Sequence, residues 1–464
     1  MAEQKATVFV ELSEGRKKLM LTAAMLMSCA YMVAAYANGT AVATQLQAIN
    51  GYHLFPVASA LQPMGMMITI SMAGKLGDTM GRKPVAITGI ILHMVFQLML
   101  GLLTNPIMFV GAYTMVGVAA GLYLSLSYAF ISDVSLPMER SKYFGYLATF
   151  NAIGCLAGPF VAGRLMQAGL TAVSFYFYIP VSLISLVIIL MVYPNKKANL
   201  SAGSKFDFLG LSYLVMSIAS IVLWLSLGGN YFGRFDMVGI LLLAAMALFG
   251  VLLVRRELNI ANPAVPLAIF RKKRFTVAFL CQFFYGAYAT CALAYTIVHA
   301  IFTMGIDPGI ASYVTMPQTI VQAVTGMFIG KWMAQKFAPR IRITALLAFG
   351  CTSVGLLIFG MTKATSPFFL LCVATAIGGF GYACGQTCLT PFFQTELEPR
   401  EFGAAQGMFM FASSGASCIF SAIAAALLGA GLSYNTVFFA GLAFTMAAFV
   451  IALVGFKIPG AKET

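Results

Sequence analysis

The stretch Gly74–Pro84 lies between two long apolar runs and reads GKLGDTMGRKP. Its glycines permit a tight turn of the chain, and Pro84 suits the first position of a helix that follows the turn. The carboxylate of Asp78 can lie near the positive N-terminus of that helix or near Arg82. The stretch therefore predicts a short polar turn between two antiparallel helices.

The composition on either side of this turn indicates a membrane protein. Of the 464 residues, 60% are hydrophobic and 9% are charged, and the mean hydropathy is +0.90. Soluble domains carry about 25% charged residues, and a soluble chain of this length could not bury so much apolar surface. A spanning helix needs roughly 20 mainly apolar residues and satisfies its own backbone hydrogen bonds. We therefore expect an all-α integral membrane protein.

Apolar runs bounded by Gly, Pro or charged residues predict fourteen spans. Two polar segments, 194–207 and 255–274, set a central pair of spans apart from six spans on either side. The predicted domains are an N-terminal six-helix bundle (1–193), cytoplasmic linkers with two extra helices (194–274) and a C-terminal six-helix bundle (275–464). The predicted spans are residues about 19–42, 53–74, 85–104, 107–131, 143–167, 172–193, 208–228, 237–254, 275–303, 309–334, 342–361, 367–392, 403–429 and 434–456.

The distribution of Lys and Arg predicts the orientation of these spans. If the N-terminus is cytoplasmic, all 28 Lys and Arg fall on the cytoplasmic side except Arg164, Arg234 and Lys363. Cytoplasmic loops carry such an excess of positive charge. We therefore expect both termini in the cytoplasm and a location in the cell (inner) membrane, and most of the +14 net charge serves insertion.

Several classes of function are disfavoured by the same residues. The basic residues form short clusters between apolar runs and no continuous basic face, so nucleic acid is not an expected partner. The nine cysteines lie in apolar runs without a CxxC pair, which predicts neither disulfides nor a metal site. No nucleophile–base constellation or buried acid pair suggests an enzyme, and no P-loop or other cofactor motif occurs.

The turn resembles the signature loop of the major facilitator superfamily, G-x-L-x-D-x-x-G-R-[KR], and agrees at every defined position. A second, weaker copy, GKWMAQKFAPRIR (Gly330–Arg342), follows the second span of the C-terminal half. The resemblance implies two six-helix halves that move during transport, with the substrate path between them. It assigns gating roles to Gly74, Asp78, Gly81, Arg82 and Lys83, and to Asp133 at the end of the fourth span. We hypothesise that Asp78, Arg82 and Asp133 form one latch at the cytoplasmic gate.

The fifth span is similar to the antiporter motif of that superfamily. Glycines at this spacing line one helix face and permit close helix packing, while a proline bends the helix. Ala162 stands where the motif has one further glycine. With the fourteen spans and the segments FDFLG (206–210) and NPAVPLAIFRKKRF (262–275), the chain resembles the fourteen-span drug:proton antiporter branch. The motif residues are Gly145, Gly154, Gly158, Pro159 and Gly163.

The chain departs from that branch in its intramembrane charges. The branch carries an aspartate in span one, where this chain has Asn38, and an arginine in span four, where alignment on Gly117 places Tyr113. All fourteen acidic residues fall in loops, tails or span ends. Because charged groups inside a membrane mark proton relays and substrate sites, a cationic substrate and carboxylate-based proton coupling are both disfavoured.

The remaining polar side chains inside spans predict a neutral, aromatic substrate site. For any one of them a hydrogen bond between helices is the alternative role, and Arg164 could also anchor the chain at the interface. His299 is the candidate proton site, because histidine titrates near neutral pH. The predicted substrate-binding residues are Tyr36, Asn38, Tyr113, Tyr123, Asn151, Arg164, Tyr285, Tyr288, His299, Gln318, Gln322, Tyr382 and Gln386.

These observations predict a secondary transporter that functions as a monomer surrounded by membrane lipid. Its substrate would be a small organic solute, neutral or anionic and aromatic or amphipathic, which is exported or exchanged by alternating access. One alternative is a proton-coupled multidrug exporter. Another is a transport-inactive membrane sensor or a channel.

Overall fold

In a computed structural model, every regular element of the described residues is a helix, apart from one isolated β-bridge between Gly228 and Phe232. The described residues are 12–135, 137–194, 207–229, 232–260, 267–335, 337–397 and 402–456. They form two compact units, the first comprising Met1–Gly51 and Gly65–Ser204 and the second Tyr52–Met64 and Lys205–Thr464. The second unit thus includes the first part of a helix that continues into the first unit. Each unit is described by itself below.

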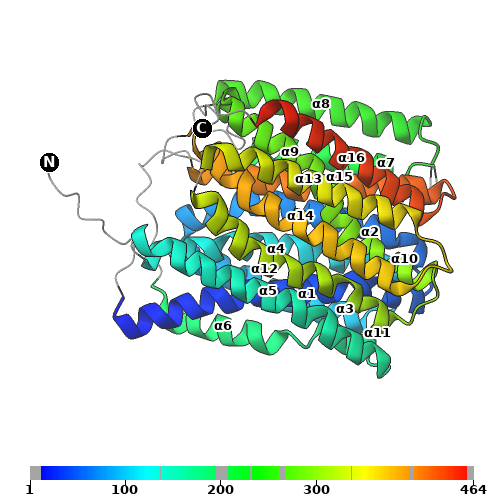
Figure 1. Cartoon of the computed structure of the whole chain (residues 1–464), viewed down its shortest axis with the longest axis horizontal. Coiled ribbons are helices and arrows are strands. Elements are labelled where there is room, and N and C mark those ends of the chain that lie inside the picture. Colours follow the sequence, from blue (N-terminus) through cyan, green and yellow to red (C-terminus); the bar gives the residue numbers. More distant parts are fainter. Residues whose placement is uncertain are drawn as a thin grey trace. The chain divides into compact units, whose positions relative to one another are not determined.

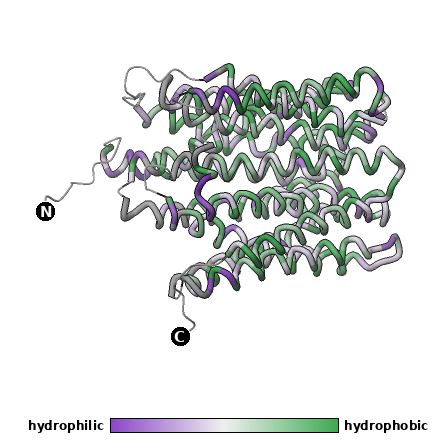
Figure 2. The backbone as a smooth tube through the Cα atoms, turned by 90° about the horizontal axis from the view of Figure 1, so that it is seen from above, coloured by the Kyte–Doolittle hydropathy of each residue, from purple (hydrophilic) through white to green (hydrophobic). Residues whose placement is uncertain are grey.

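The first unit contains the first helices of the chain, which run roughly alongside one another (Figure 1). The first helix, α1, packs against α4, α5 and α6. Hydrophilic residues lie mostly near the ends of the helices, and the residues along the helices are mainly hydrophobic (Figure 2). The elements are α1 (Glu14–Ala48), η1 (Tyr52–Leu54, in the second unit), α2 (Phe55–Met80), α3 (Arg82–Leu102), α4 (Pro106–Val134), α5 (Pro137–Gln167), η2 (Thr171–Phe175) and α6 (Ile179–Val192).

The second unit contains the remaining helices. Helices α7 and α8 form a hairpin, α9 packs against α15 and α16, and α14 packs against α12 and α13. A π-helical segment, η4, joins α9 to α10 without a break. The elements are α7 (Phe208–Leu227), α8 (Met237–Asn259), η3 (Leu267–Arg271), α9 (Lys273–Thr290), η4 (Cys291–Tyr295), α10 (Thr296–Phe302), α11 (Pro308–Ala311), η5 (Ser312–Thr315), α12 (Met316–Gln335), α13 (Phe337–Met361), α14 (Phe368–Gln394), α15 (Phe402–Gly429) and α16 (Tyr434–Gly455).

Ten helices within the described ranges are long and apolar enough to cross a membrane. The prediction of an all-helical membrane protein is therefore confirmed. The count of fourteen spans and the three-part division of the chain stay predictions. The described part of the predicted central pair corresponds to α7 and α8, and both belong to the second unit.

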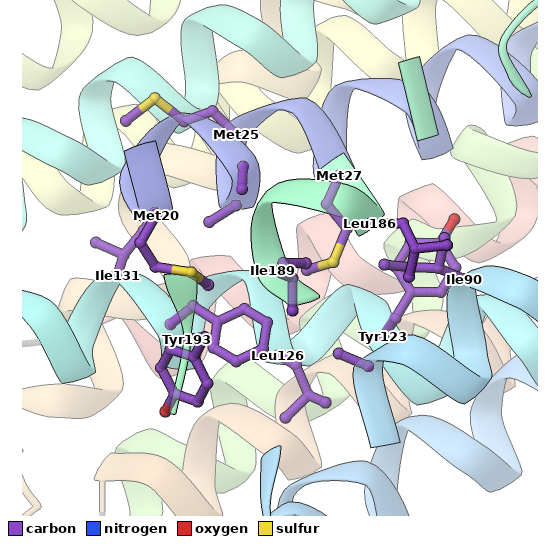
Figure 3. Packing of buried hydrophobic residues seen from close by; sticks show 14 of the residues in the cluster. Met20, Met25, Met27, Ile90, Tyr123, Leu126, Ile131, Leu186, Ile189 and Tyr193 are labelled. Carbon is purple, nitrogen blue, oxygen red and sulfur yellow. The ribbon is translucent and has the colours of Figure 1, made fainter. Parts of the chain in front are cut away.

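The core of the first unit is built from aliphatic and aromatic side chains of α1, α3, α4 and α6. Met20, Ile131, Ile189 and Tyr193 are among its fully or nearly fully buried members (Figure 3). Methionine fills irregular spaces between helices because its side chain is unbranched and flexible. This packing holds the ends of α3, α4 and α6 together, and three of the predicted gate residues, Arg82, Lys83 and Asp133, lie at the ends of α3 and α4.

The predicted turn between α2 and α3 consists of one residue, Gly81, because α2 ends at Met80 and α3 begins at Arg82. Gly81 has φ +99°, a conformation that L residues with a Cβ rarely adopt. Helix α3 begins at Arg82, so Pro84 is its third residue and the expectation that Pro84 opens the helix was wrong. Proline is still tolerated there because the first-turn N–H groups of a helix have no partner within it.

Candidate functional site

The predicted gate contains an ion pair between α3 and α4. The guanidinium of Arg82 contacts the Asp133 carboxylate, and the side chain of Asp133 is only 5% exposed. The hydroxyl of Tyr193, which follows α6, donates a hydrogen bond of 2.6 Å to the other oxygen of this carboxylate. One buried carboxylate thus ties together three helices of the first unit. We call Arg82, Asp133 and Tyr193 the latch.

The other predicted gate residues lie close to Arg82 in the sequence. The ammonium of Lys83 donates to the backbone oxygen of Leu190 on α6 at 2.7 Å, and Gly81 makes the break between α2 and α3. The side chain of Asp78 and the surroundings of Gly74 lie outside the described residues. The role of Asp78 in the latch therefore stays a hypothesis.

The glycines of the predicted antiporter motif bring α5 against the backbone of α1. A Cβ on Gly154 would lie 2.6 Å from the Cys29 carbonyl oxygen, and one on Gly158 would lie 2.7 Å from the Val33 carbonyl oxygen. Gly158 also contacts the Cβ of Tyr36. Only glycine allows this approach without displacing backbone atoms. Of the other motif residues, Pro159 and Gly163 are buried on α5, and the surroundings of Gly145 lie outside the described residues.

Polar side chains of the first unit are paired with one another. The Asn38 side-chain oxygen accepts a long hydrogen bond, 3.4 Å, from the Gln97 amide, and the Ser28 hydroxyl donates to Asn151 at 2.7 Å. These pairs join α1 to α3 and α1 to α5. Asn38 and Asn151 thus make hydrogen bonds between helices of this unit, and their role in substrate binding stays a prediction. Tyr113 lies half-buried on α4 without such a pair in the hydrogen bonds seen here.

A buried histidine of the first unit, His93, lies within hydrogen-bonding distance of two tyrosine hydroxyls. The Nδ1 atom of His93 lies 2.9 Å from the Tyr178 hydroxyl and 3.3 Å from the Tyr123 hydroxyl. The Tyr31 ring completes the cluster, with its centroid 6.4 Å from that of Tyr123. If the phenols donate to Nδ1, the histidine proton lies on Nε2; if Nδ1 carries the proton, it donates to a phenol oxygen, and the Tyr178 hydroxyl can donate to the His93 carbonyl at 3.4 Å.

The second unit gathers three of the predicted tyrosines. The Tyr285 and Tyr382 rings stack with centroids 5.3 Å apart, and the Tyr288 ring lies 6.1 Å from that of Tyr382. Glycines of α14 make room for the phenols. A Cβ on Gly378 would lie 2.1 Å from the Tyr288 hydroxyl oxygen, and one on Gly385 would lie 2.8 Å from that of Tyr285.

Three buried polar atoms on α9 and α12, the helices that pack with α14, have no hydrogen-bond partner among the described residues. They are Gln282 Oε1 on α9, the Tyr288 hydroxyl and Gln318 Oε1 on α12. The backbone of Gln318 packs on Gly379, next to the glycine that faces Tyr288. Most buried polar side-chain atoms are hydrogen-bonded, so these groups can accept or donate bonds to a polar ligand. We call Gln282, Tyr285, Tyr288, Gln318 and Tyr382 the tyrosine–glutamine cluster.

His299 lies at a different place, on α10. Its Nε2 is 3.0 Å from the Thr362 hydroxyl oxygen, and that hydroxyl donates to the Phe359 carbonyl at 2.6 Å. Nε2 is therefore the protonated nitrogen, and the buried Nδ1 has no hydrogen-bond partner within the described chain. The rings of Phe438 and Tyr434 pack beside it. The structure thus places His299 outside the tyrosine–glutamine cluster.

The remaining predicted substrate residues are scattered. Arg164 is exposed on α5, and Gln386 is exposed on α14. Gln322 is half-buried on α12, one turn beyond Gln318. An exposed arginine near the end of α5 has the position of an interface anchor, the alternative role considered for Arg164.

Three contributors to these arrangements are absent from the predicted site, namely His93, Tyr178 and Tyr193. Tyr178 and Tyr193 immediately flank α6 as its cap residues, where neither helical periodicity nor a motif marks them. His93 carries a signal, since it is one of three histidines in the chain. Its partners Tyr123 and Tyr178 lie 30 and 85 residues further along the chain, so the sequence near His93 does not indicate them.

A cavity of about 580 Å³ in the second unit was also not predicted. The hydroxyls of Tyr52 and Tyr434 are hydrogen-bonded to each other beside it. The buried Ser226 hydroxyl, which has no partner in the described part of the chain, also lines it. None of the predicted substrate residues borders this cavity, whose lining is Tyr52, His53, Pro56, Val57, Ser226, Ala425, Leu428, Gly429 and Tyr434.

Comparison with known families decides what this arrangement of helices is. The family model described as "Major Facilitator Superfamily" matches residues 20–299 and 278–464. The chain belongs to the Major Facilitator Superfamily. The predicted membership of this superfamily is therefore confirmed, and the chain is a multi-pass membrane transporter of small solutes and not an enzyme. The role of the antiporter motif in α5 stays a prediction.

Individual relatives of this superfamily chain are distant. It is 23% identical over 416 residues to "Multidrug resistance protein 3" of Bacillus subtilis (strain 168), covering 89% of this chain and 78% of the relative. It is also 23% identical to "Multidrug transporter protein MdtP" of the same organism, covering 80% of this chain and 68% of that protein. These similarities extend across most of each protein.

Solved structures share the fold at lower identity. A POT family transporter solved in complex with 5-aminolevulinic acid superposes with a TM-score of 0.72 at 12% identity, covering 94% of each chain. The nucleoside transporter NupG (D323A mutant) superposes with a TM-score of 0.67 at 15% identity, covering 95% of this chain and all of that one. At such identities the likeness establishes the fold alone.

Proposed function

We propose that this transporter carries a neutral or anionic organic solute with aromatic or amphipathic character, by export or exchange. The observation that carries the proposal is the tyrosine–glutamine cluster, where Gln282, Tyr288 and Gln318 keep buried polar atoms without partners in the described chain. Two amide oxygens and one phenol offer hydrogen bonds, while the stacked rings of Tyr285 and Tyr382 offer an apolar aromatic surface.

The charge around this cluster limits the substrate further. Helix α14 contains no charged residue, α9 contains none after Arg274, and α12 contains only Lys331, near its end. A buried organic cation needs a carboxylate partner because uncompensated charges inside a protein are costly. The cluster therefore favours a substrate that is uncharged where it contacts these rings.

A second candidate, a proton-coupled multidrug exporter, is favoured by the names of the two Bacillus relatives. Stacked aromatic rings and methionine-rich walls can accept many apolar compounds. Proton coupling would need a titratable group, for which His299 is the candidate. If His299→Gln transports with an unchanged pH dependence, this role is dismissed.

We further propose fourteen spans with both termini in the cytoplasm of a cell membrane, and a monomer as the functional form. The excess of Lys and Arg between alternate spans supports this orientation. The membrane pair α7 and α8 would then be the two extra helices between two six-helix halves that alternate in access. Labelling of single cysteines placed near residues 12 and 456 tests the orientation, and reaction of either from the outside contradicts it.

The decisive measurement of substrate class is flux into proteoliposomes containing the full chain. The panel contains neutral aromatic compounds, aromatic carboxylates and organic cations, each with and without a pH gradient. We expect saturable flux of neutral or anionic aromatic compounds. Selective, proton-driven flux of cations would instead establish the multidrug exporter.

Point variants then locate the site. Tyr288→Phe removes one unpartnered hydroxyl and Gln318→Leu one unpartnered amide, so we expect each to raise KM about tenfold, the loss of one or two hydrogen bonds at about 1 kcal/mol each. Tyr146→Phe is the matched control, because it removes a hydroxyl from a residue that is 47% exposed on α5 of the first unit, whereas the tyrosine–glutamine cluster belongs to the second unit. Equal KM values for Tyr288→Phe and the control would move the substrate site elsewhere.

Asp78 tests the gate independently of the substrate. We expect Asp78→Asn to abolish transport while membrane insertion and yield stay normal, because the hypothesis assigns its carboxylate to a moving latch. Transport at the normal rate by Asp78→Asn would remove Asp78 from the mechanism. That result would leave the pairing of Arg82 with Asp133 untouched.

A further inference from the structure

The hairpin of α7 and α8 carries a small open cavity at the end where α7 begins and α8 ends. Its volume is about 330 Å³. Among the described residues, two arginines, an asparagine and a tyrosine line it together with two aliphatic side chains, and none of the described lining side chains is acidic. The lining is Tyr213, Leu252, Arg255, Arg256, Asn259 and Ile260.

Both arginines have donor groups to spare. Arg256 contacts Asp207 through Nε at 2.7 Å, which leaves its two terminal amino groups without a hydrogen bond among the described residues. Arg255 is exposed, and no hydrogen bond from its guanidinium to the described part of the chain is seen. Asn259 donates its side-chain amide to the backbone oxygen of Arg255 at 2.7 Å, which orders the last turn.

The rest of α8 shows what surrounds this cavity. The most apolar part of α8, within Met237–Glu257, has a mean hydropathy of 2.8, and only 6% of its residues are buried inside the protein. Leu248 and Val251 are 56% and 52% exposed, and they lie seven and four residues before Arg255 on one face of the helix. An apolar face that is open over most of its length lies against acyl chains in a membrane protein.

We propose that this cavity binds the phosphate headgroup of an anionic phospholipid whose acyl chains lie along the exposed face of α8. Guanidinium groups match phosphate oxygens in a forked geometry, and basic pockets at the ends of membrane helices bind anionic headgroups. Arg255 and the free amino groups of Arg256 contact the phosphate. Leu252 and Ile260 contact the adjoining glycerol and the first acyl carbons.

The ion pair of Arg256 with Asp207 supports the site and does not compete for it. Asp207 also accepts a hydrogen bond of 2.9 Å from the Gly210 N–H and so caps α7. The same carboxylate therefore fixes the start of α7, the end of α8 and the direction of the Arg256 guanidinium. A lipid phosphate bound to Arg256 would therefore be linked through Asp207 to the start of α7 as well as to the end of α8.

The test counts bound lipids on the purified, delipidated full chain by native mass spectrometry. The probes are dioleoyl-phosphatidylglycerol, dioleoyl-phosphatidylcholine with the same acyl chains, and soluble glycerol phosphate. We expect saturable binding of phosphatidylglycerol that Arg255→Gln weakens about fivefold, the effect of one basic group worth about 1 kcal/mol. Arg271→Gln is the matched control, because Arg271 is exposed on η3 and lies outside the cavity lining.

Three outcomes would overturn the proposal. Equal loss in Arg255→Gln and Arg271→Gln would show unspecific attraction to positive charge. Equal affinity for phosphatidylcholine would show that net headgroup charge is irrelevant. Competition by glycerol phosphate at the same concentration would assign the cavity to a free phosphate compound. Arg256→Lys, which keeps the charge but loses the fork, should bind phosphatidylglycerol more weakly than the unaltered chain and sharpens a positive result.

Discussion

The start of α3 in the first unit and the start of α13 in the second unit are held to the last helix of their own unit in the same way. Lys83 donates to the backbone oxygen of Leu190 on α6, and Arg342 donates to that of Leu453 on α16 at 3.3 Å. Leu190 and Leu453 each lie two residues before the end of their helix. The two units share this part of their scaffold.

The aromatic residue that follows each last helix extends the correspondence. Tyr193 packs on Phe130 of α4 with ring centroids 4.7 Å apart, and Phe456 packs on Phe392 of α14 at 4.0 Å. Asp133 lies three residues after Phe130, and Thr395 lies three residues after Phe392. At these two corresponding positions the second unit has a threonine and a phenylalanine in place of the carboxylate and the phenol of the latch.

The arginines at the starts of α3 and α13 also have different partners. Arg82 binds a buried carboxylate on another helix, whereas Arg340 lies over the Trp332 ring at 4.8 Å and donates to the Trp332 carbonyl, a residue near it in sequence. Arg340 on α13 and Trp332 on α12 also lie on neighbouring helices, but they are eight residues apart in the chain, whereas Arg82 and Asp133 are 51 residues apart. A contact across the turn between two consecutive helices can persist when other helices separate, while a contact between helices distant in the chain breaks. We therefore expect the Arg82 contact to belong to a switchable gate and the Arg340 contact to stay within a fixed turn.

Loss of the two arginines should give the largest difference between the units. Arg82→Ala leaves Asp133 buried without this cation, and breaking a buried pair costs about 3 kcal/mol or more. Arg340→Ala loses a partly exposed cation–π contact worth about 0.5–1 kcal/mol. We expect transport to be lost in the first and largely retained in the second, measured by flux and by thermal unfolding in detergent. Equal losses would end the distinction between a switchable and a fixed turn.

The phenol of the latch should give the next largest effect. Tyr193→Phe removes a hydrogen bond to a charged group, worth about 1.5–3 kcal/mol, and we expect a lower unfolding temperature with an altered exchange rate. The matched change in the second unit is Phe456→Tyr, which adds a hydroxyl near Thr395 and should gain little. A Tyr193→Phe variant that unfolds and transports like the unaltered chain would remove Tyr193 from the latch.

The sequence predicted this comparison only in part. The turn at Gly74–Pro84 and the position of Asp133 led to the expectation of an ion pair with Arg82, which the structure shows. Tyr193 was missed because a single tyrosine after a helix carries no periodic or motif signal. The pairing of His93 with Tyr178 was missed for the same reason, since contacts between residues distant in the chain depend on helix rotation. Apolar run length predicts where the chain can span a membrane but not which face of each helix meets which neighbour.

Helix packing offers a comparison at the next scale. Gly154→Ala places a Cβ 2.6 Å from the Cys29 carbonyl oxygen on α1, and in the second unit Gly286→Ala on α9 places one 2.5 Å from Ala416 Cβ on α15. Overpacking of this kind costs about 1–3 kcal/mol, so we expect both to unfold at lower temperature. Gly111→Ala is the control, because nothing lies within 4 Å of its added Cβ and alanine favours a helix. A destabilised control would attribute the effects to the glycine backbone and not to packing.

The smallest expected effect tests whether the corresponding hydrogen bonds of Lys83 and Arg342 contribute equally to the stability of the two units. Lys83→Ala and Arg342→Ala each remove one hydrogen bond to a backbone oxygen near the end of the last helix, and both side chains are partly or fully exposed. Such bonds are worth about 0.5–1 kcal/mol, because water replaces much of what is lost. We expect equal, small decreases in unfolding temperature and transport within about twofold of the unaltered chain, the rate change that 0.4 kcal/mol produces. A much larger loss of transport in Lys83→Ala alone would place Lys83 in the switchable gate beside Arg82, because an equal contribution to stability could not explain an unequal contribution to transport.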